Sequence, residues 1–309
     1  MKSLVYIESH EGKIEKNSLE LITAAKILGE VSAFVGADAS VAEEVSSYGV
    51  HVDLYEVCES EQDILANIEG LAKEADAVFF PATALGKDLG PRLAARVNSA
   101  YISDVVSVEL KDGKALYSRP LYGGTVYESF TVQEGLLQVV SVRGGIFAKA
   151  ERSGTADVSA HEAVKSEETN PLVDTVVELT ETVDLEAADV VVAGGRGCGS
   201  EEGFAMVEDL AKTLHGVVGA SRPAIEAGWI SRAHQVGQSG KNVSPKLYIA
   251  CGISGALQHV SGITNSRCIV AINKDPDASI FDVADIGIVG TCEAVLPLLN
   301  EALKQHYGE

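Results

Sequence analysis

The chain has 309 residues, of which 46% are hydrophobic and 22% are charged, so it is long enough for two domains with ordinary hydrophobic cores. Its formal charge of -21 argues against nucleic acid and anionic membranes as partners. No apolar run approaches the ~20 residues that cross a bilayer, and the N-terminal segment MKSLVYIESHEGK lacks the apolar centre of a signal peptide, so we expect a cytoplasmic protein that is not inserted in a membrane.

The first hundred residues alternate predicted strands and helices. The strands are expected at 3–9, 31–37, 51–57 and 75–82, and the helices at 18–29, near 40–48, at 61–75 and at 86–100. Such alternation is typical of a parallel sheet with right-handed helical crossovers. Residues 101–147 instead contain closely spaced strands with glycine turns, ending in LLQVVSVRGG, so we expect the sheet to finish in an antiparallel section.

The next forty residues or so are polar and acidic, and we expect a connector in which only VDTVVELTETVD (173–184) forms an edge strand. A second α/β unit follows, with strands expected at 189–195, 216–220, 246–252, 268–273 and 286–290 and a last helix at 293–305. The sequence therefore predicts an α/β fold of two domains, residues 1–187 and 188–309, each with a mainly parallel sheet flanked by helices.

The negative charge is unevenly divided between these domains. Residues 1–187 carry 15 Lys and Arg against 32 Asp and Glu, whereas residues 188–309 carry 9 against 13. The second domain is thus the less repulsive place for a cofactor that bears phosphates.

Glycine-rich and donor-rich segments follow the predicted strands of the second domain. DVVVAGGRGCGSEEGF leads through a glycine-rich turn into a helix whose N-terminus favours an anion, and Arg196 could pair with a phosphate there; a tight structural turn is the alternative. Ser221 and Arg222 precede Pro223, where Ser221 could equally be a plain N-cap and Arg222 a surface arginine. HQVGQSGK is rich in donors and suits a heteroaromatic ring edge or a phosphate, unless it is an ordinary solvated loop.

Two more strand ends carry polar side chains. ACGISGALQHVSGI places residues 254–259 at the carboxyl edge of the sheet, where open α/β sheets bind ligands, although His259 could instead be a core histidine with satisfied hydrogen bonds. Asn273, Lys274 and Asp275 end the next strand, and the alternative there is a plain turn before the proline.

Catalytic and metal-binding patterns are missing from the sequence. There is no paired Ser/His/Asp pattern, no C-x-x-C or H-x-x-x-H spacing and no Walker phosphate loop. We expect the five cysteines to be free thiols, mostly buried: Cys58, Cys198, Cys251, Cys268 and Cys292. The pattern favours binding of a large polar cofactor over bond-making by side chains.

Taken in order, GASRPAIEAGW, QVGQSGK, KLYIACGISGALQH, AINKDPDASIF and ADIGIVG resemble the FAD domain of the electron-transfer flavoprotein alpha family. The resemblance is strong over about 188–309 and looser before it, and it implies a Rossmann-like domain that binds one FAD non-covalently. The cofactor-binding residues that it implies are Arg196, Ser221, Arg222, Val236, Gly237, Gln238, Ser239, Ser254, Gly255, Ala256, Leu257, Gln258, His259, Asn273, Thr291 and Cys292.

The resemblance also implies individual roles. Arg222 would lie over the isoalloxazine ring, Ser239 near its N5 and His259 near its C2 carbonyl. An arginine charge and a histidine N–H in a low-dielectric pocket favour negative charge on the N1–C2=O side of the reduced ring and raise its first reduction potential. Ser239 stands where many members have Thr and keeps the hydroxyl, whereas Thr291 follows IGIVG where a small residue and Asp are common, and it supplies no carboxylate.

The resemblance implies an electron carrier that works as a heterodimer with a beta subunit, which is a separate chain. The N-terminal domain would mainly serve to bind that subunit. Electrons would arrive from acyl-CoA dehydrogenases of fatty acid β-oxidation or from other flavin dehydrogenases, and would leave toward a quinone oxidoreductase or the respiratory chain. Two alternatives stay open: a subunit of an NADH-dependent electron-bifurcating flavoprotein whose partner holds a second FAD, and a redox-inactive scaffold that binds FAD or another nucleotide.

Overall fold

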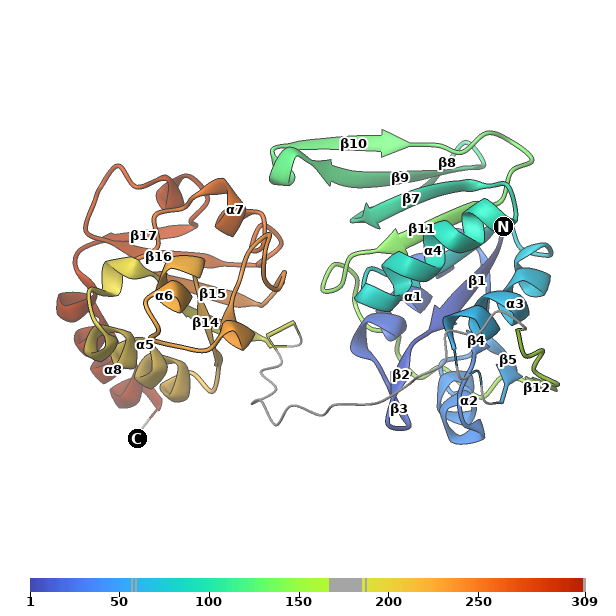
Figure 1. Cartoon of the computed structure of the whole chain (residues 1–309), viewed down its shortest axis with the longest axis horizontal. Helices are drawn as coiled ribbons and strands as arrows, with labels where there is room; N and C mark the ends of the chain where they lie inside the picture. The colour runs from blue at the N-terminus through green and yellow to red at the C-terminus, as the bar shows by residue number, and fades with distance from the viewer. Residues whose placement is uncertain (57, 59, 167–184, 187, 308–309) are drawn as a thin grey trace. The chain divides into compact units, whose positions relative to one another are not determined.

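The chain divides into two compact units, Met1–Val176 and Val177–Glu309 (Figure 1). The structure, a computed structural model, describes residues 1–309 except 57, 59, 167–184, 187 and 308–309. The edge strand expected at 173–184 lies outside the described residues, and the domain boundary expected after residue 187 stays a prediction. Leu185, just before that boundary, is fully buried in a core of the second unit.

The first unit is built on a seven-stranded sheet in the order β12-β5-β4-β1-β6-β11-β7, in which every neighbouring pair is parallel. Its strands are β1 Lys2–Ile7, β4 Glu30–Val35, β5 His51–Tyr55, β6 Ala77–Pro81, β7 Ala100–Val105, β11 Gln138–Val142 and β12 Val158–His161. Its helices are α1 Lys16–Lys26, α2 Ala39–Ser46, α3 Glu61–Ala72 and α4 Ala84–Arg96, and a small hairpin joins β2 Ser9–His10 to β3 Lys13–Ile14. The alternation predicted for the first hundred residues is confirmed.

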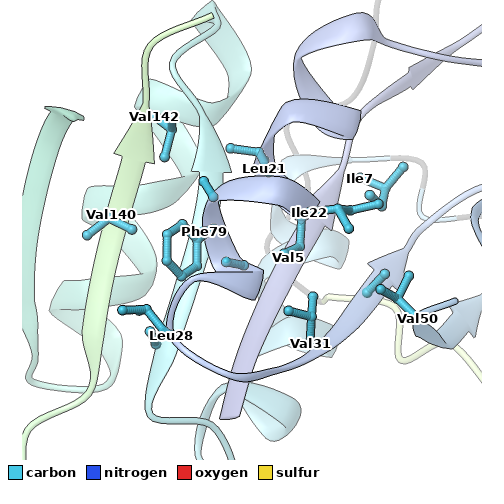
Figure 2. Close-up of a cluster of buried hydrophobic side chains, with 14 of the residues drawn as sticks. Val5, Ile7, Leu21, Ile22, Leu28, Val31, Val50, Phe79, Val140 and Val142 are labelled. Carbon is cyan, nitrogen blue, oxygen red and sulfur yellow. The ribbon is translucent and has the colours of Figure 1, made fainter. Parts of the chain in front are cut away.

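Helices cover both faces of this sheet, and successive residues of a strand point to opposite faces. Val5 of β1 packs in one core with Leu21 of α1 and Phe79 of β6 (Figure 2). Tyr6, the next residue along, packs in a second core that α3 and α4 supply. A strand buried on both faces is a continuous apolar run, which is why SLVYI and AVFF were readable as strands.

The strands predicted within 101–147 are arranged differently from the expectation. Three of them, β8 Ser107–Lys111, β9 Lys114–Leu121 and β10 Val126–Phe130, form a separate antiparallel sheet, with the short 3-10 helix η1 Tyr122–Gly124 before β10. The strand expected from LLQVVSVRGG, β11, returns to the main sheet and pairs parallel on both sides, so its inclusion in the antiparallel section was wrong. Its buried valines give it two apolar faces, which only an interior strand can bury.

One strand of the first unit falls where the sequence predicted only a connector. β12 pairs parallel with β5 and is mostly exposed, so it lacks the apolar pattern of its neighbours. His161 at its end holds it in place: Nε2 lies 2.8 Å from Oδ1 of Asp53, and the imidazole stacks on the ring of Tyr55 at 4.8 Å between centroids.

The second unit is a five-stranded, wholly parallel sheet in the order β14-β13-β15-β16-β17. All its strands were predicted: β13 Val190–Gly194, β14 Val217–Ala220, β15 Leu247–Cys251, β16 Ile269–Asn273 and β17 Ile286–Val289. The longer helices are α5 Glu201–Thr213 and α8 Cys292–Tyr307, and the short ones are α6 Arg222–Glu226, α7 Leu257–Val260 and the 3-10 turns η2 Arg196–Cys198, η3 Arg232–His234 and η4 Ser279–Asp282.

The two faces of the second sheet are covered unequally. On one face Val192 and Ile249 pack in a core with α5 and α8. On the other, Val191 packs with Val236 and Ile263, which come from the irregular segments between the strands. The sheet therefore has helices on one side and loops and short turns on the other.

Within the described residues, no helix is both long and apolar enough to span a bilayer, and no group of three or more His, Cys, Asp or Glu side chains is arranged to hold a metal ion. All five cysteines are free thiols, as predicted, with Cys198, Cys251 and Cys292 buried.

Candidate functional site

A cavity of about 970 Å³ lies at the carboxyl ends of β13, β14, β15 and β16. The chain leaves β13 toward α5 on one face of the sheet, whereas it leaves the neighbouring β15 toward Val260 and Ile263 on the other. Two adjacent strands whose connections diverge in this way open a crevice between them, which is where open α/β sheets bind ligands. The fold thus forms the cavity at its topological switch point.

The glycine-rich turn after β13 is built to pack against the loop after β15. The amide of Gly195 donates to the carbonyl oxygen of Cys251 at 2.8 Å, and that of Gly197 donates to Gly252 at 2.9 Å. A β-carbon on Gly197 would lie 2.6 Å from that same Gly252 oxygen, so a larger residue would not fit. These glycines meet protein backbone, which supports the structural alternative for them, while Arg196 between them is exposed on the cavity wall.

Ser221 and Arg222 form the next part of the wall. Ser221 occupies the N-cap position of α6, but its side chain makes no capping hydrogen bond, although the residue is only 6% exposed. Its hydroxyl is therefore not used by the helix. Arg222 is exposed and its Nε donates to Glu226 at 2.8 Å, an ion pair within one helical turn that contributes little to stability and leaves the other guanidinium nitrogens available.

The segment 235–241 is held in a compact loop by hydrogen bonds within the segment and to Gln258. Lys241 donates its amide to the carbonyl of Gln235, and Gln238 donates its amide to the carbonyl of Gln258 at 2.7 Å. The buried Gln235 side chain donates from Nε2 to Oγ of Ser239 at 2.8 Å. Because Ser239 accepts this bond, its own hydroxyl hydrogen is left to donate elsewhere, and Ser239 lines the cavity.

His259 is a buried polar group of the wall, as Ser221 is. It is 7% exposed, its Nε2 lies 2.9 Å from Oη of Tyr248, and its Nδ1 is buried without a hydrogen-bond partner within the described residues. Burial lowers the pKa of His259 from 6.5 to about 4, so the imidazole is neutral near pH 7, while the Val236 backbone opposes the shift. The site therefore presents an uncharged imidazole with one unsatisfied nitrogen.

Asn273 joins two loops beneath the cavity. Its Nδ2 donates to the carbonyl of Ile253 at 2.8 Å, and its Oδ1 accepts from the amide of Asp275 at 3.0 Å. The second bond is the Asx turn that the sequence left open, and the first ties the end of β16 to the loop after β15.

Most of the predicted cofactor-binding residues line this one cavity, although no ligand contact is tested by that placement. Those on its wall are Arg196, Ser221, Arg222, Val236, Gln238, Ser239, Ser254, Ala256, Gln258, His259 and Asn273. The others lie outside the lining: Gly237, Gly255, Leu257, Thr291 and Cys292.

The residues outside the lining have structural explanations. Gly237 and Gly255 are buried at positive φ, and Leu257 is exposed. Thr291 is exposed, and its Oγ1 accepts from the amide of Ala294 at 3.3 Å in the first turn of α8. The Cys292 side chain points into the core, where its Sγ lies 3.7 Å from Sγ of Cys198, so the thiol is directed away from the cavity. As ligand contacts these positions stay predictions.

Sequence reasoning missed two groups that shape the wall from behind. Gln235 orients Ser239, and Tyr248 contacts His259. Gln235 lay within the segment already noted for its donors, so the signal was present, whereas Tyr248 looked like any aromatic residue of a buried strand. Charged residues of the turn after β16 also face the cavity: Lys274, Asp275 and Asp277.

Comparison with known proteins agrees with both units. Residues 3–166 match the family model described as the electron transfer flavoprotein domain, and residues 184–264 match the one described as the electron transfer flavoprotein FAD-binding domain. Proteins named electron transfer flavoprotein subunit alpha are similar over nearly their whole length. The one from Megasphaera elsdenii is 41% identical, with 98% of this chain and 96% of the relative covered. The one from Bacillus subtilis is 38% identical (98% and 98%), and the one from Thermoanaerobacterium thermosaccharolyticum 36% identical (97% and 97%).

Proposed function

The chain belongs to the electron transfer flavoprotein alpha-subunit family and binds FAD, and from this premise we propose that it holds FAD in the cavity of its second unit and shuttles single electrons as a heterodimer with a beta subunit. In this proposal the donors are flavin dehydrogenases such as acyl-CoA dehydrogenases, the acceptor is a quinone oxidoreductase or the respiratory chain, and the protein works in the cytoplasm. The names of the relatives as alpha subunits support the heterodimer.

The cavity fits FAD in size and in the groups on its wall. Ligand pockets usually measure about 300–1,000 Å³, and about 970 Å³ lies at the upper end of that range. Arg196, Arg222 and Lys274 supply positive charge for a pyrophosphate in an otherwise acidic chain. The observation that carries the proposal is the buried, unpartnered Nδ1 of His259, because such a nitrogen needs a ligand atom to complete its hydrogen bonding.

Bound FAD would supply the one-electron chemistry, and the residues of the chain would set its surroundings. His259 would face the ring carbonyl between N1 and N3 with a neutral N–H. Arg222 would place a fixed positive charge beside the ring, and Ser239, oriented by Gln235, would offer its hydroxyl hydrogen at N5. Donors fixed in a pocket shielded from water stabilise added negative charge more than the same groups in water would.

The test is the flavin content and redox behaviour of the chain purified together with its partner. We expect a single FAD per heterodimer and a radical signal in electron paramagnetic resonance during stepwise reduction. Two FAD with oxidation of NADH would overturn the simple carrier in favour of the bifurcating complex, and bound FAD without a radical signal would favour the scaffold. A heterodimer that cannot take up FAD would refute the proposal altogether.

A matched pair of arginine variants tests the location. Arg222→Ala and Arg92→Ala each remove an exposed ion pair within one helical turn, but only Arg222 lines the cavity. We expect weaker FAD retention and a lower flavin potential in Arg222→Ala, with Arg92→Ala unchanged. Equal behaviour of the two variants would place the flavin elsewhere.

A further inference from the structure

Tyr248 is buried beneath the cavity wall, and the only hydrogen-bond partner of its hydroxyl within the described residues is the ring of His259. It belongs to β15, whereas His259 belongs to α7, eleven residues further along the chain. The two rings lie 6.2 Å apart between centroids, and Tyr248 does not line the cavity. The phenol thus touches the inner side of an imidazole that lines the cavity and whose other nitrogen is buried with no hydrogen-bond partner within the described residues.

The direction of this hydrogen bond follows from counting buried donors and acceptors. If Nε2 of His259 carried the hydrogen and donated to Oη, the Tyr248 hydroxyl hydrogen would have no acceptor within the described residues and Nδ1 would be a second buried, unpaired atom. If Tyr248 donates instead, its hydrogen is satisfied and only an Nδ1–H remains to be paired. The second arrangement leaves fewer buried groups without partners, and each such group costs about 1–3 kcal/mol.

One further observation agrees with a donating tyrosine. Burial raises the pKa of Tyr248 well above 10, so the phenol keeps its proton throughout the physiological range and has a hydrogen to donate to Nε2.

We propose that Tyr248 is a positioning residue, which donates its hydroxyl hydrogen to Nε2 of His259 and so fixes the neutral tautomer with hydrogen on Nδ1, ready to donate to a carbonyl oxygen of the ligand. The inference rests on the proposed function only in taking that ligand to be the flavin ring. Without the phenol, the hydrogen would be free to move to Nε2, and Nδ1 would then face the carbonyl with a lone pair.

The test compares Tyr248→Phe with Tyr117→Phe in the full chain co-expressed with its partner. Tyr117 is the matched control, because it is also fully buried and its Oη donates to Gln138 at 2.7 Å, but it lies in the first unit. Histidine labelled with ¹⁵N distinguishes a ring nitrogen that carries hydrogen from one that does not, and a His259→Gln spectrum assigns the signals. Melting temperatures report whether both variants fold.

We expect the wild type and Tyr117→Phe to show hydrogen on Nδ1 of His259 and a bare Nε2, with and without FAD. In Tyr248→Phe the two signals should average or exchange places, the dissociation constant for FAD should rise by about tenfold, as the loss of one hydrogen bond implies, and the flavin potential should fall. The inference is refuted if the wild type carries its hydrogen on Nε2, or if Tyr248→Phe leaves the His259 signals unchanged. A wild type that shows the expected tautomer yet binds no FAD would contradict the proposed function and leave the tyrosine assignment standing.

Discussion

At the scale of single residues, His259 joins two properties that are usually separate. It is packed like a core residue against Tyr248, and it also lines a cavity with one nitrogen unsatisfied. An imidazole removed from water strongly disfavours its charged form, so the group acts as a neutral hydrogen-bond donor. A site that needs a donor without a titrating charge is well served by such a residue.

This burial makes stability depend on pH. The folded-state pKa of about 4 lies below the unfolded value of 6.5, so the unfolded chain binds a proton between these values that the folded chain does not. The contribution of His259 to the free energy of unfolding is fully present above about pH 6.5 and is lost as the pH falls toward 4, by up to about 3 kcal/mol in total. Urea unfolding followed over this range should show the second unit losing stability. The slope of its unfolding free energy against pH should be flatter in His259→Gln.

The control for this prediction is His306→Gln, which alters an exposed histidine of α8 and should keep the wild-type slope. The slope is compared rather than the stability at neutral pH, because His259→Gln also disturbs the partner of Tyr248. A wild-type slope in His259→Gln would mean that another group causes the acid sensitivity.

The sequence could predict where His259 lies but not what holds it. Strand and helix signals placed it at the carboxyl edge of the sheet, and a core role stood as the alternative; the structure combines the two. Tyr248 and Gln235 escaped notice because the direction of a hydroxyl or amide depends on how the intervening chain turns, and no local pattern encodes that turn.

At the scale of elements, two loops of the second unit, those after β15 and β16, are in direct backbone contact. Gly255, in the loop after β15, has a φ of +88°, and a β-carbon there would lie 2.1 Å from the amide nitrogen of Ile280. The turn after β16 is held against this loop, since the amide of Ile280 donates to the carbonyl of Ser254 at 3.1 Å. Only glycine at position 255 lets the two loops of the cavity wall come this close.

A pair of glycine variants separates the cost of a positive φ from the cost of a steric clash between the two loops. Gly228 also has a positive φ, +78°, but has open space where a β-carbon would stand. We expect Gly228→Ala to cost about 1 kcal/mol from the left-handed conformation alone, and Gly255→Ala to cost more than about 2 kcal/mol because the backbone must also move apart. Chemical denaturation measures both, and equal losses would mean that the loops can separate freely.

Elements with a clear apolar pattern were predictable, and those without one were not. The strands with two buried faces and the amphipathic helices appeared in the expected order. β12 was missed because its mostly exposed residues VSAH lack an apolar pattern, and the contacts of His161 with Asp53 and with the ring of Tyr55 support its pairing with β5. β11 was recognised as a strand but given the wrong neighbours, since its pairing is set by the return of the chain after the β9–β10 hairpin.

At the scale of the whole molecule, the chain consists of two units that each bury their own cores. The cavity and every residue on its wall belong to the second unit. A ligand bound there stabilises only the folded form of that unit, so its effect should be visible as a change in one part of the unfolding profile.

Calorimetry of the full chain should therefore show two transitions, of which FAD raises only one. At a free FAD concentration of a hundred times its dissociation constant, the free energy of unfolding of the second unit should rise by about 2.7 kcal/mol. Phe79→Ala and Phe204→Ala identify the transitions, because each removes a fully buried ring from one unit and should cost about 3–5 kcal/mol there. A single transition that FAD shifts as a whole would show that the units unfold together.

The burial of His259 also determines how the site responds to changes in cellular pH. A group that keeps one charge across the physiological range exchanges no protons with the solvent when cellular acidity drifts. The imidazole therefore presents the same dipole to a bound ligand at every pH of that range. Its electrostatic contribution to the potential of a bound flavin should vary little with cellular pH.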